Sequence, residues 1–147
     1  MDYQAFVKEQ IAEIQRIVKD GSAINALSGG VDSSVVTVLG HRSLGDRLKT
    51  VFIENGLMRK DEPERVVGLF KEMGIPVQLV DARRDFLNAL RGLTDPEEKR
   101  NAITKTFYST VTPVSGLASS FSNPGEDSSA VASLYSGMMI PLRIMIL

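Results

Sequence analysis

Six consecutive residues near the start of the chain have the types and the order that suit polyphosphate binding. The segment Ser28-Gly29-Gly30-Val31-Asp32-Ser33, followed by Ser34, combines two glycines, one carboxylate and several hydroxyls. Glycines let the backbone turn sharply and bring its N–H groups close to phosphate oxygens. The carboxylate of Asp32 suits Mg²⁺, which prefers carboxylate, phosphate and water oxygens. The segment therefore predicts a site for the phosphate end of a nucleotide together with Mg²⁺.

The neighbours of this loop strengthen the prediction. Residues 23–27 are typical of a short buried strand, and a helix is expected from about Asp32 to Leu44. The N-terminal end of that helix would point its positive dipole at the same phosphate. Two better-known glycine loops do not fit, because the Walker pattern needs a lysine and the dinucleotide pattern needs G-x-G-x-x-G. The plain alternative is an ordinary glycine-rich turn between a strand and a helix.

Strands and helices alternate over the first two thirds of the chain. Apolar residues at helical spacing predict a helix over residues 2–19. The further elements expected are strands at 50–53 and 76–80 and helices at 61–73, at 86–90 and from 95 onward. This order favours an α/β fold, Rossmann-like, with a parallel sheet and flanking helices. In such sheets ligands bind beyond the carboxyl ends of the strands, so the turns after Leu27, Ile53 and Val80 are expected to form the site.

The composition changes after about Tyr108. Residues 109–147 contain only three charged residues but nine serines. No period of 2 or 3.6 is clear between Ser109 and Ser129, which is typical of loop or weak structure. We therefore expect a nucleotide-binding domain over residues 1–107, an atypical tail over 108–147, and a sheet that is incomplete at its C-terminal side.

The overall composition excludes several functions. With 147 residues and a net charge of −1, the chain suits one domain and lacks the basic excess typical of nucleic-acid binding. No apolar run approaches the roughly 20 residues that span a bilayer. The absence of cysteine excludes disulfides, thiolate zinc sites and cysteine nucleophiles, and a single histidine, His41, excludes a histidine-rich metal site. A cytoplasmic location is the simplest interpretation.

Five stretches of the chain carry a resemblance to a known family. They are residues 26–35, 51–60, 80–82 and 86–90, and the string Thr94-Asp95-Pro96-Glu97-Glu98-Lys99-Arg100. Over residues 1–107 the chain resembles the N-type ATP pyrophosphatases, and GMP synthetases in particular. The resemblance implies an adenine nucleotide alpha hydrolase-like fold. Glu54 stands where the family commonly has aspartate. The family's later motifs are not recognisable after Tyr108, which a truncated or frame-shifted reading frame or a diverged tail would explain.

The resemblance also implies a reaction and a set of site residues. GMP synthetases use ATP and Mg²⁺ to adenylylate xanthosine monophosphate (XMP), and ammonia then displaces AMP to give GMP in purine biosynthesis. By resemblance, residues 28–34 hold ATP, Asp32 and Ser33 are catalytic, and Asp32 binds the metal. Ile53 and Gly56 would lie against the adenosine, and Arg100 would contact XMP.

The resemblance further implies partners. Family members obtain ammonia from a glutamine amidotransferase with a catalytic cysteine, so a chain without cysteine is expected to pair with a separate glutaminase subunit, as in archaeal types. By resemblance, the full-length protein could form a homodimer. No nucleic acid or membrane partner is expected.

Several alternatives stay open at this point. The chain could be another ATP pyrophosphatase, such as an NAD synthetase or a tRNA-modifying relative, or a catalytically inactive ATP-binding module. Position alone predicts a helix salt bridge between Arg100 and Glu97. Arg59 or Lys60 could contact ATP phosphates, and Asp81 could contact the adenosine.

Overall fold

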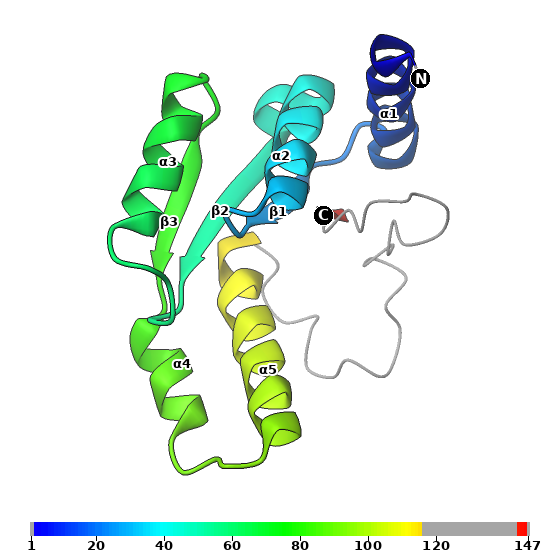
Figure 1. Cartoon of the computed structure of the whole chain (residues 1–147). Coiled ribbons are helices and arrows are strands. Elements are labelled where there is room, and N and C mark those ends of the chain that lie inside the picture. The colour runs from blue at the N-terminus through cyan, green and yellow to red at the C-terminus, as the bar shows by residue number, and fades with distance from the viewer. Residues whose placement is uncertain (1, 116–143, 147) are drawn as a thin grey trace.

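The computed structural model describes residues 2–115 and 144–146, and it contains one four-stranded sheet flanked by helices (Figure 1). The strands are β1 (Ala23–Leu27), β2 (Leu48–Glu54), β3 (Val77–Asp81) and β4 (Ile144–Ile146). The helices are α1 (Tyr3–Val18), α2 (Val31–Leu44), the 3-10 turn η1 (Gly45–Arg47), α3 (Glu62–Glu72), α4 (Arg83–Leu90) and α5 (Pro96–Ser115).

The sheet confirms the predicted α/β class. Its strand order is β3-β2-β1-β4, and β1, β2 and β3 are parallel. Ala23 pairs with Leu48 and Leu27 with Phe52, so the carboxyl ends of β1 and β2 lie at the same edge. Parallel pairing requires crossover connections, and the helices between successive strands supply them.

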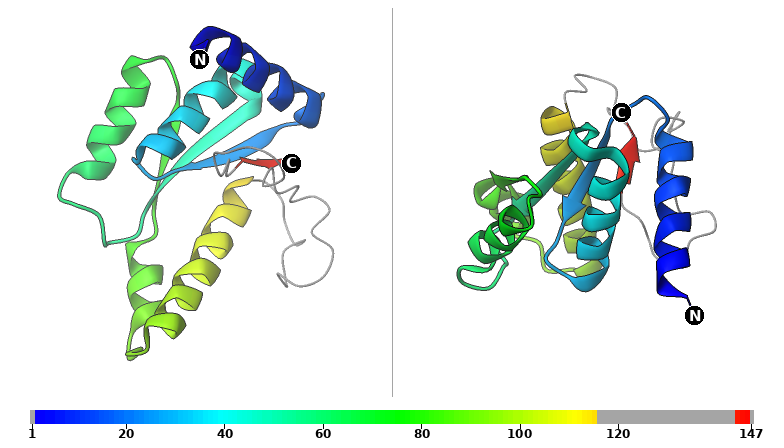
Figure 2. Two further views of the ribbon diagram at one scale, coloured as in Figure 1. Left: turned by 45° about the vertical axis from the view of Figure 1, so that its right-hand side comes forward. Right: turned by 90° about the horizontal axis from the view of Figure 1, so that it is seen from above.

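Alternating residues of the central strands face opposite sides of the sheet and pack into three apolar clusters. On one face, Leu27 and Phe52 pack with α3, while Ala23 and Leu48 pack with α1 and α2. On the other face, residues of β1 and β2 pack with α4 and α5; they include Ile24, Val51 and Ile53. Two further views show helices on both faces of the sheet, with α1 outermost beside α2 (Figure 2). Because successive side chains of a strand point to opposite faces of the sheet, each strand packs against helices on both faces.

Local signals explain where two of the helices begin. The carboxylate of Asp2 accepts hydrogen bonds from the N–H groups of Gln4 and Ala5, at 3.0 and 3.1 Å, and so caps α1. Pro63 lies in the first turn of α3, where its missing N–H costs nothing. The residue before α3, Asp61, adopts a left-handed conformation with φ of 58° and makes no capping bond.

The tail differs from the expectation in two places. Residues 109–115 are not loop, because α5 continues through them to Ser115, and β4 adds a strand antiparallel to β1. The reason is an apolar stripe, Ile103, Phe107 and Val111, which continues past the expected boundary and buries Val111 against the sheet. The expected division of the chain at residues 107 and 108 stays a prediction, and residues 116–143 lie outside the described part.

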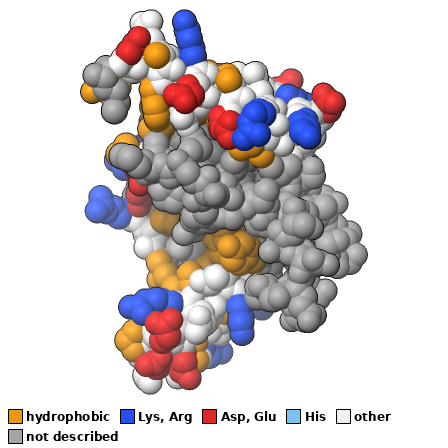
Figure 3. Space-filling model, turned by 90° about the vertical axis from the view of Figure 1, so that its right-hand side faces the viewer, with side chains coloured by type: hydrophobic (Ala, Val, Ile, Leu, Met, Phe, Trp, Pro, Cys, Tyr) orange, Lys and Arg blue, Asp and Glu red, His pale blue; other side chains and the backbone are white. Residues whose placement is uncertain are grey.

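Two surface properties complete the description. Among the described residues, no helix is long and apolar enough to cross a membrane. On the face drawn in Figure 3, the described Lys and Arg side chains are interspersed with Asp and Glu rather than separated from them, which fits the net charge of −1. The expected cytoplasmic location stays a prediction.

Candidate active site

The glycine loop joins β1 directly to α2, as predicted, and hydrogen bonds within the loop fix its shape. Ser33 Oγ accepts a bond from the N–H of Ser28 at 3.2 Å and donates to the carbonyl of Gly30 at 3.1 Å. The hydroxyls of Ser28 and Ser33 lie 2.9 Å apart, and the hydroxyl of Ser34 donates to the carbonyl of Gly30 at 2.8 Å. The loop is therefore closed on itself by its serines before any ligand binds.

The N-terminus of α2 offers its backbone donors to a ligand. Gly30 is the N-cap residue and has no side chain with which to cap the helix, in contrast to Asp2 at the start of α1. The first N–H groups of a helix have no partner within it and carry partial positive charge. Those of Val31, Asp32 and Ser33 are placed to bind an anion, which is the property that a phosphate site requires.

The fold requires glycine at one of the two glycine positions of the loop and not at the other. Gly29 adopts φ of +80°, and a Cβ there would lie 3.2 Å from Val66 Cγ2 of α3. Gly30 has φ of −78°, which any residue adopts, and a Cβ there would meet only Ser28 Oγ at 3.6 Å, an ordinary contact. Glycine is thus required at position 29 by the fold, whereas at position 30 the fold does not require it.

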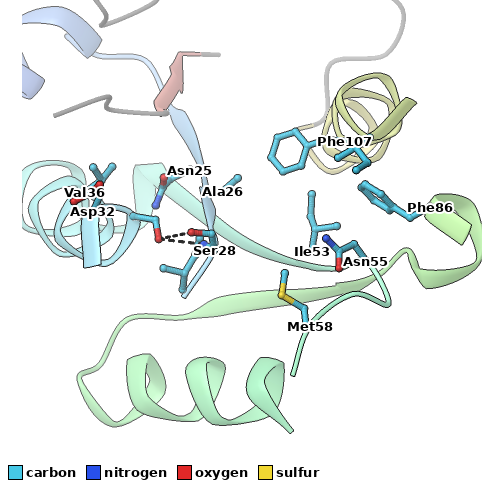
Figure 4. Close-up of a pocket in the computed structure, with 13 residues that line it drawn as sticks. Asn25, Ala26, Ser28, Asp32, Val36, Ile53, Asn55, Met58, Phe86 and Phe107 are labelled. Carbon is cyan, nitrogen blue, oxygen red and sulfur yellow. Dashed lines mark hydrogen bonds between the residues drawn. The ribbon is translucent and has the colours of Figure 1, made fainter. Parts of the chain in front are cut away.

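A cavity of about 410 Å³ opens beside the loop at the carboxyl ends of β1 and β2 (Figure 4). Four of the predicted site residues line it: Ser28, Asp32, Ser33 and Ile53. The other predicted loop residues, Gly29, Gly30, Val31 and Ser34, complete the loop but are not among the lining residues, and neither are Gly56 and Arg100.

The remaining lining residues were not named individually from the sequence. They are Asn25, Ala26, Leu27, Val36, Asn55, Met58, Phe86, Ile103 and Phe107. Asn55 belongs to the turn after Ile53, which was expected to form part of the site. The aromatic residues of α4 and α5 carried no such signal, since only the packing of the two helices over β2 brings Phe86 and Phe107 beside Ile53.

The cavity has a polar end and an apolar end. Figure 4 shows Asp32 and the bonded pair of Ser28 with its loop partner at one end, and Phe86 and Phe107 at the other. Among the described residues that line it, Asp32 alone is charged. An anionic group is thus favoured beside the helix N-terminus, and a flat apolar group is favoured between Ile53 and the two phenylalanines.

The turn after β2 is held by its own side chains. Glu54 Oε1 accepts a bond from the N–H of Gly56 at 2.7 Å, and Asn55 Oδ1 accepts one from the N–H of Leu57 at 2.9 Å. Gly56 has φ of +79° and packs against Arg83, 3.5 Å from the position of a Cβ. Glu54, which replaces the aspartate common in the family, is long enough to close this turn.

Asp81 at the end of β3 is engaged by Arg83 rather than free toward the cavity. Arg83 Nη2 lies 2.6 Å from Asp81 Oδ2, and both side chains are exposed. The side-chain hydrogen bonds from Arg83, followed by its backbone N–H, lower the pKa of Asp81 to about 2. The suggested contact of Asp81 with an adenosine stays a prediction.

Arg100 forms the helix salt bridge that position alone predicts. Its Nη1 lies 2.5 Å from Glu97 Oε2, one turn earlier on α5, and both side chains are largely exposed. An exposed pair of this kind contributes little to stability, at most about 1 kcal/mol. The pair leaves Arg100 at the surface, where a ligand phosphate could replace the carboxylate of Glu97.

The donor set of the cavity suits magnesium that arrives with a nucleotide. Among the described residues, no group of three or more His, Cys, Asp and Glu side chains could hold a metal ion. Mg²⁺ in nucleotide sites is held by one or two carboxylates, with phosphates and water completing its shell. A single carboxylate, Asp32, beside the phosphate loop fits that arrangement and does not fit a permanently bound ion.

Comparison with known proteins identifies the class. A family model described as NAD synthase matches residues 2–108. The chain therefore belongs to the NAD synthase family of ATP pyrophosphatases. Within that family the resemblance to GMP synthetases is confirmed. One subunit of the glutamine-hydrolyzing GMP synthase of Archaeoglobus fulgidus is 55% identical over 107 residues, which are 73% of this chain and 35% of that protein.

Solved structures confirm the fold. The NH3-dependent NAD synthetase of Campylobacter jejuni superposes with a TM-score of 0.66 at 20% identity, over 80% of this chain and 53% of that one. The glutamine-dependent NAD+ synthetase of Acinetobacter baumannii, solved in complex with ADP, gives a TM-score of 0.61 at 16% identity, over 78% and 23% of the two chains. The chain spans about a third of the length of the GMP synthase subunit to which it is similar.

Proposed function

We propose that the chain binds MgATP in the cavity beside the glycine loop and takes part in the adenylylation of XMP, the first half of GMP synthesis. One observation carries the proposal: the uncapped N-terminus of α2, with Ser28, Asp32 and Ser33, opens into a cavity whose far end is apolar. This polarity matches the triphosphate and the base of one nucleotide. The similarity to the archaeal GMP synthase subunit supports XMP as the second substrate.

The residues of the loop have a defined task in that reaction. An oxygen of XMP attacks the α-phosphorus of ATP, a new P–O bond forms, and the bond to the β,γ-pyrophosphate breaks. The N–H groups at the start of α2 and the serine hydroxyls would receive the negative charge of the leaving pyrophosphate. Mg²⁺, held by Asp32 and the phosphates, would neutralise part of that charge. Ammonia then attacks C2 of the adenylylated base and AMP leaves, which gives GMP.

The position of Arg100 supports a role in binding XMP. Arg100, Ile103 and Phe107 are spaced at i, i+3 and i+7 and therefore share one face of α5. Ile103 and Phe107 line the cavity, and Arg100 lies about 10 Å along the helix axis from Phe107. A second nucleotide that lay there would meet a fork of donors suited to its phosphate.

The source of ammonia is also a proposal. The similar archaeal proteins are named as one of the subunits of a glutamine-hydrolyzing enzyme, and the chain contains no cysteine. We therefore expect a separate glutamine amidotransferase subunit to supply ammonia. A homodimer of the full-length protein stays a prediction.

A second candidate function is ATP binding without turnover. The chain spans about a third of the length of the archaeal GMP synthase subunit, and the observation that carries the proposal concerns ATP binding rather than the transfer step. The test is pyrophosphate release with ATP, Mg²⁺, XMP and ammonium. Release supports the proposal, and ATP binding without release favours the second candidate. Release with nicotinate adenine dinucleotide in place of XMP would exclude XMP as the substrate.

The assignment of Arg100 has its own test. Arg100→Ala should raise the KM for XMP without changing ATP binding or the melting temperature. Glu97→Ala is the matched control, because it removes the same ion pair and leaves the guanidinium in place. Equal effects of the two substitutions would show that only the ion pair matters and would remove Arg100 from the XMP site.

A further inference from the structure

Two buried polar side chains behind the phosphate loop form a chain of hydrogen bonds that ends on the loop. Asn25 of β1 is 1% exposed and Thr37 of α2 is fully buried. Asn25 Nδ2 donates to Thr37 Oγ1 at 2.6 Å, and Thr37 Oγ1 donates to the carbonyl of Ser33 at 2.7 Å. We call this Asn25–Thr37–Ser33 series the relay. It connects the central strand to the residue whose hydroxyl organises the loop.

The direction of the relay follows from the number of protons available. Thr37 has one hydroxyl proton and donates it to Ser33, so only the amide nitrogen of Asn25 can complete the contact. Asn25 Oδ1 is then left buried with no hydrogen-bond partner in the described part of the chain. A buried unpaired oxygen is costly, and a leucine of the same size at position 25 would avoid that cost. The polar pair therefore needs a reason other than packing.

The position of Ser33 supplies that reason. The carbonyl of Ser33 accepts a hydrogen bond from the hydroxyl of Thr37. Its hydroxyl accepts a hydrogen bond from the N–H of Ser28 and donates one to the carbonyl of Gly30. In Figure 4 the side chain of Asn25 points from β1 toward α2, on the side where Asp32 lies. The relay thus fixes the first turn of α2 relative to β1, and with it the donors that face the phosphate.

We infer that Asn25 and Thr37 are positioning residues for the phosphate-binding loop. Thr37 does not line the cavity, and Asn25, which does, gives its amide N–H to Thr37. They hold Ser33 and the open N-terminus of α2 in the geometry that receives pyrophosphate, because bonds in such a series strengthen one another when buried. This inference rests on the proposed function.

The experiment separates positioning from simple structural support. Thr37→Val leaves the amide of Asn25 unpaired and should lower both the melting temperature and the affinity for pyrophosphate and MgATP in calorimetric titration. The double variant Asn25→Leu/Thr37→Val replaces both partners by apolar groups of similar shape, so its melting temperature should recover toward the wild type. Its affinity should stay about five- to tenfold weaker, the factor that one hydrogen bond of ordinary strength provides.

Ser43→Ala is the matched control within the same helix. The hydroxyl of Ser43 is also buried and donates to the carbonyl four residues earlier, Leu39, at 2.6 Å, but it lies at the far end of α2 from the loop. This variant should bind both probes as the wild type does. A loss of affinity equal to that of Thr37→Val would show that any such bond in α2 matters, and would overturn the inference.

A measurement without ligand gives a second readout. Hydrogen exchange in the double variant should be about tenfold faster at the amides of residues 34–37 and unchanged at residues 39–44. A double variant with wild-type affinity and wild-type exchange refutes the inference while the proposed function stands. A wild-type chain that binds neither pyrophosphate nor MgATP refutes the proposed function and this inference together.

Discussion

The two glycines of the phosphate loop allow stability and ligand binding to be separated by a pair of substitutions. Gly30→Ala introduces a methyl group at φ of −78°, where the nearest atom, Ser28 Oγ, would be 3.6 Å away. The fold should accept it: the poorer N-cap costs about 0.5–1 kcal/mol, and the lower conformational entropy of alanine in the unfolded chain offsets about the same amount, so the melting temperature should change by less than about 2 °C. The same methyl group would stand beside Ser28 Oγ in the space that a phosphate needs to approach the backbone.

Gly29→Ala should lower the stability of the fold as well as the affinity. The left-handed conformation at φ of +80° costs an alanine about 1–2 kcal/mol, and its Cβ would lie 3.2 Å from Val66 Cγ2. A loss of about 2 kcal/mol corresponds to a fall in melting temperature of about 4–8 °C in a chain of this size. The affinity of the protein that stays folded should fall as well, because the loop must move away from α3.

Thermal denaturation and calorimetric titration with MgATP and pyrophosphate measure both quantities on the same samples. We expect Gly30→Ala to retain the wild-type melting temperature and to bind at least about tenfold more weakly, a change of about 1.4 kcal/mol. Wild-type affinity of Gly30→Ala would refute the reasoning, because it would mean that the phosphates do not approach the backbone at the start of α2. A wild-type melting temperature for Gly29→Ala would contradict the described packing of the loop on α3.

Three further predictions concern single charged residues. Asp32→Asn should abolish the Mg²⁺-dependent part of ATP binding in titrations with and without EDTA, whereas Asp46→Asn, at the opposite end of α2, should not; equal binding by both would remove Asp32 from the metal site. Asp61→Gly should raise the melting temperature by about 2–4 °C, since glycine relieves the left-handed strain at φ of 58°, and an unchanged value would show that aspartate bears no strain there. In the wild type the Asp81 carboxylate should titrate near pH 2 by NMR, so its contribution to stability is present above its usual pKa of 3.8 and is lost as the pH falls through about 2. Arg83→Ala should return that pKa toward 3.8, and an unmoved pKa would show that Arg83 is not its cause.

Much of the fold could be predicted because its signals are local. Pro63 marks the start of α3, Gly74 its end, and Pro76 the start of β3, while apolar runs mark the strands. The parallel sheet and the position of the phosphate loop could therefore be predicted from short stretches of sequence. The cavity contains Ser28, Asp32 and Ser33 for a related reason. Ligands bind beyond the carboxyl ends of parallel strands, and the loop between β1 and α2 lies at that edge of the sheet.

The apolar half of the site could not be predicted, because it depends on contacts between distant segments. Phe86 and Phe107 meet Ile53 only after α4 and α5 have packed over the sheet. The length of α5 was underestimated for a different reason. Threonines are weak helix formers, yet the hydroxyls of Thr106 and Thr110 donate to the carbonyls of Ala102 and Thr106, so the helix accommodates them.

The pairing of β4 with β1 has a consequence for the order in which the molecule folds. β1, β2 and β3 are neighbours along the chain, whereas β4 joins Ile144 to Asn25 across more than a hundred residues. Closing so long a loop costs about 1.5 kcal/mol more in chain entropy than closing the β1–β2 loop, and only three residue pairs are gained in return. β4 should therefore join the sheet after the parallel strands have paired, and it should detach first when the protein opens. Its loss should not disturb the phosphate loop, which lies at the other end of β1.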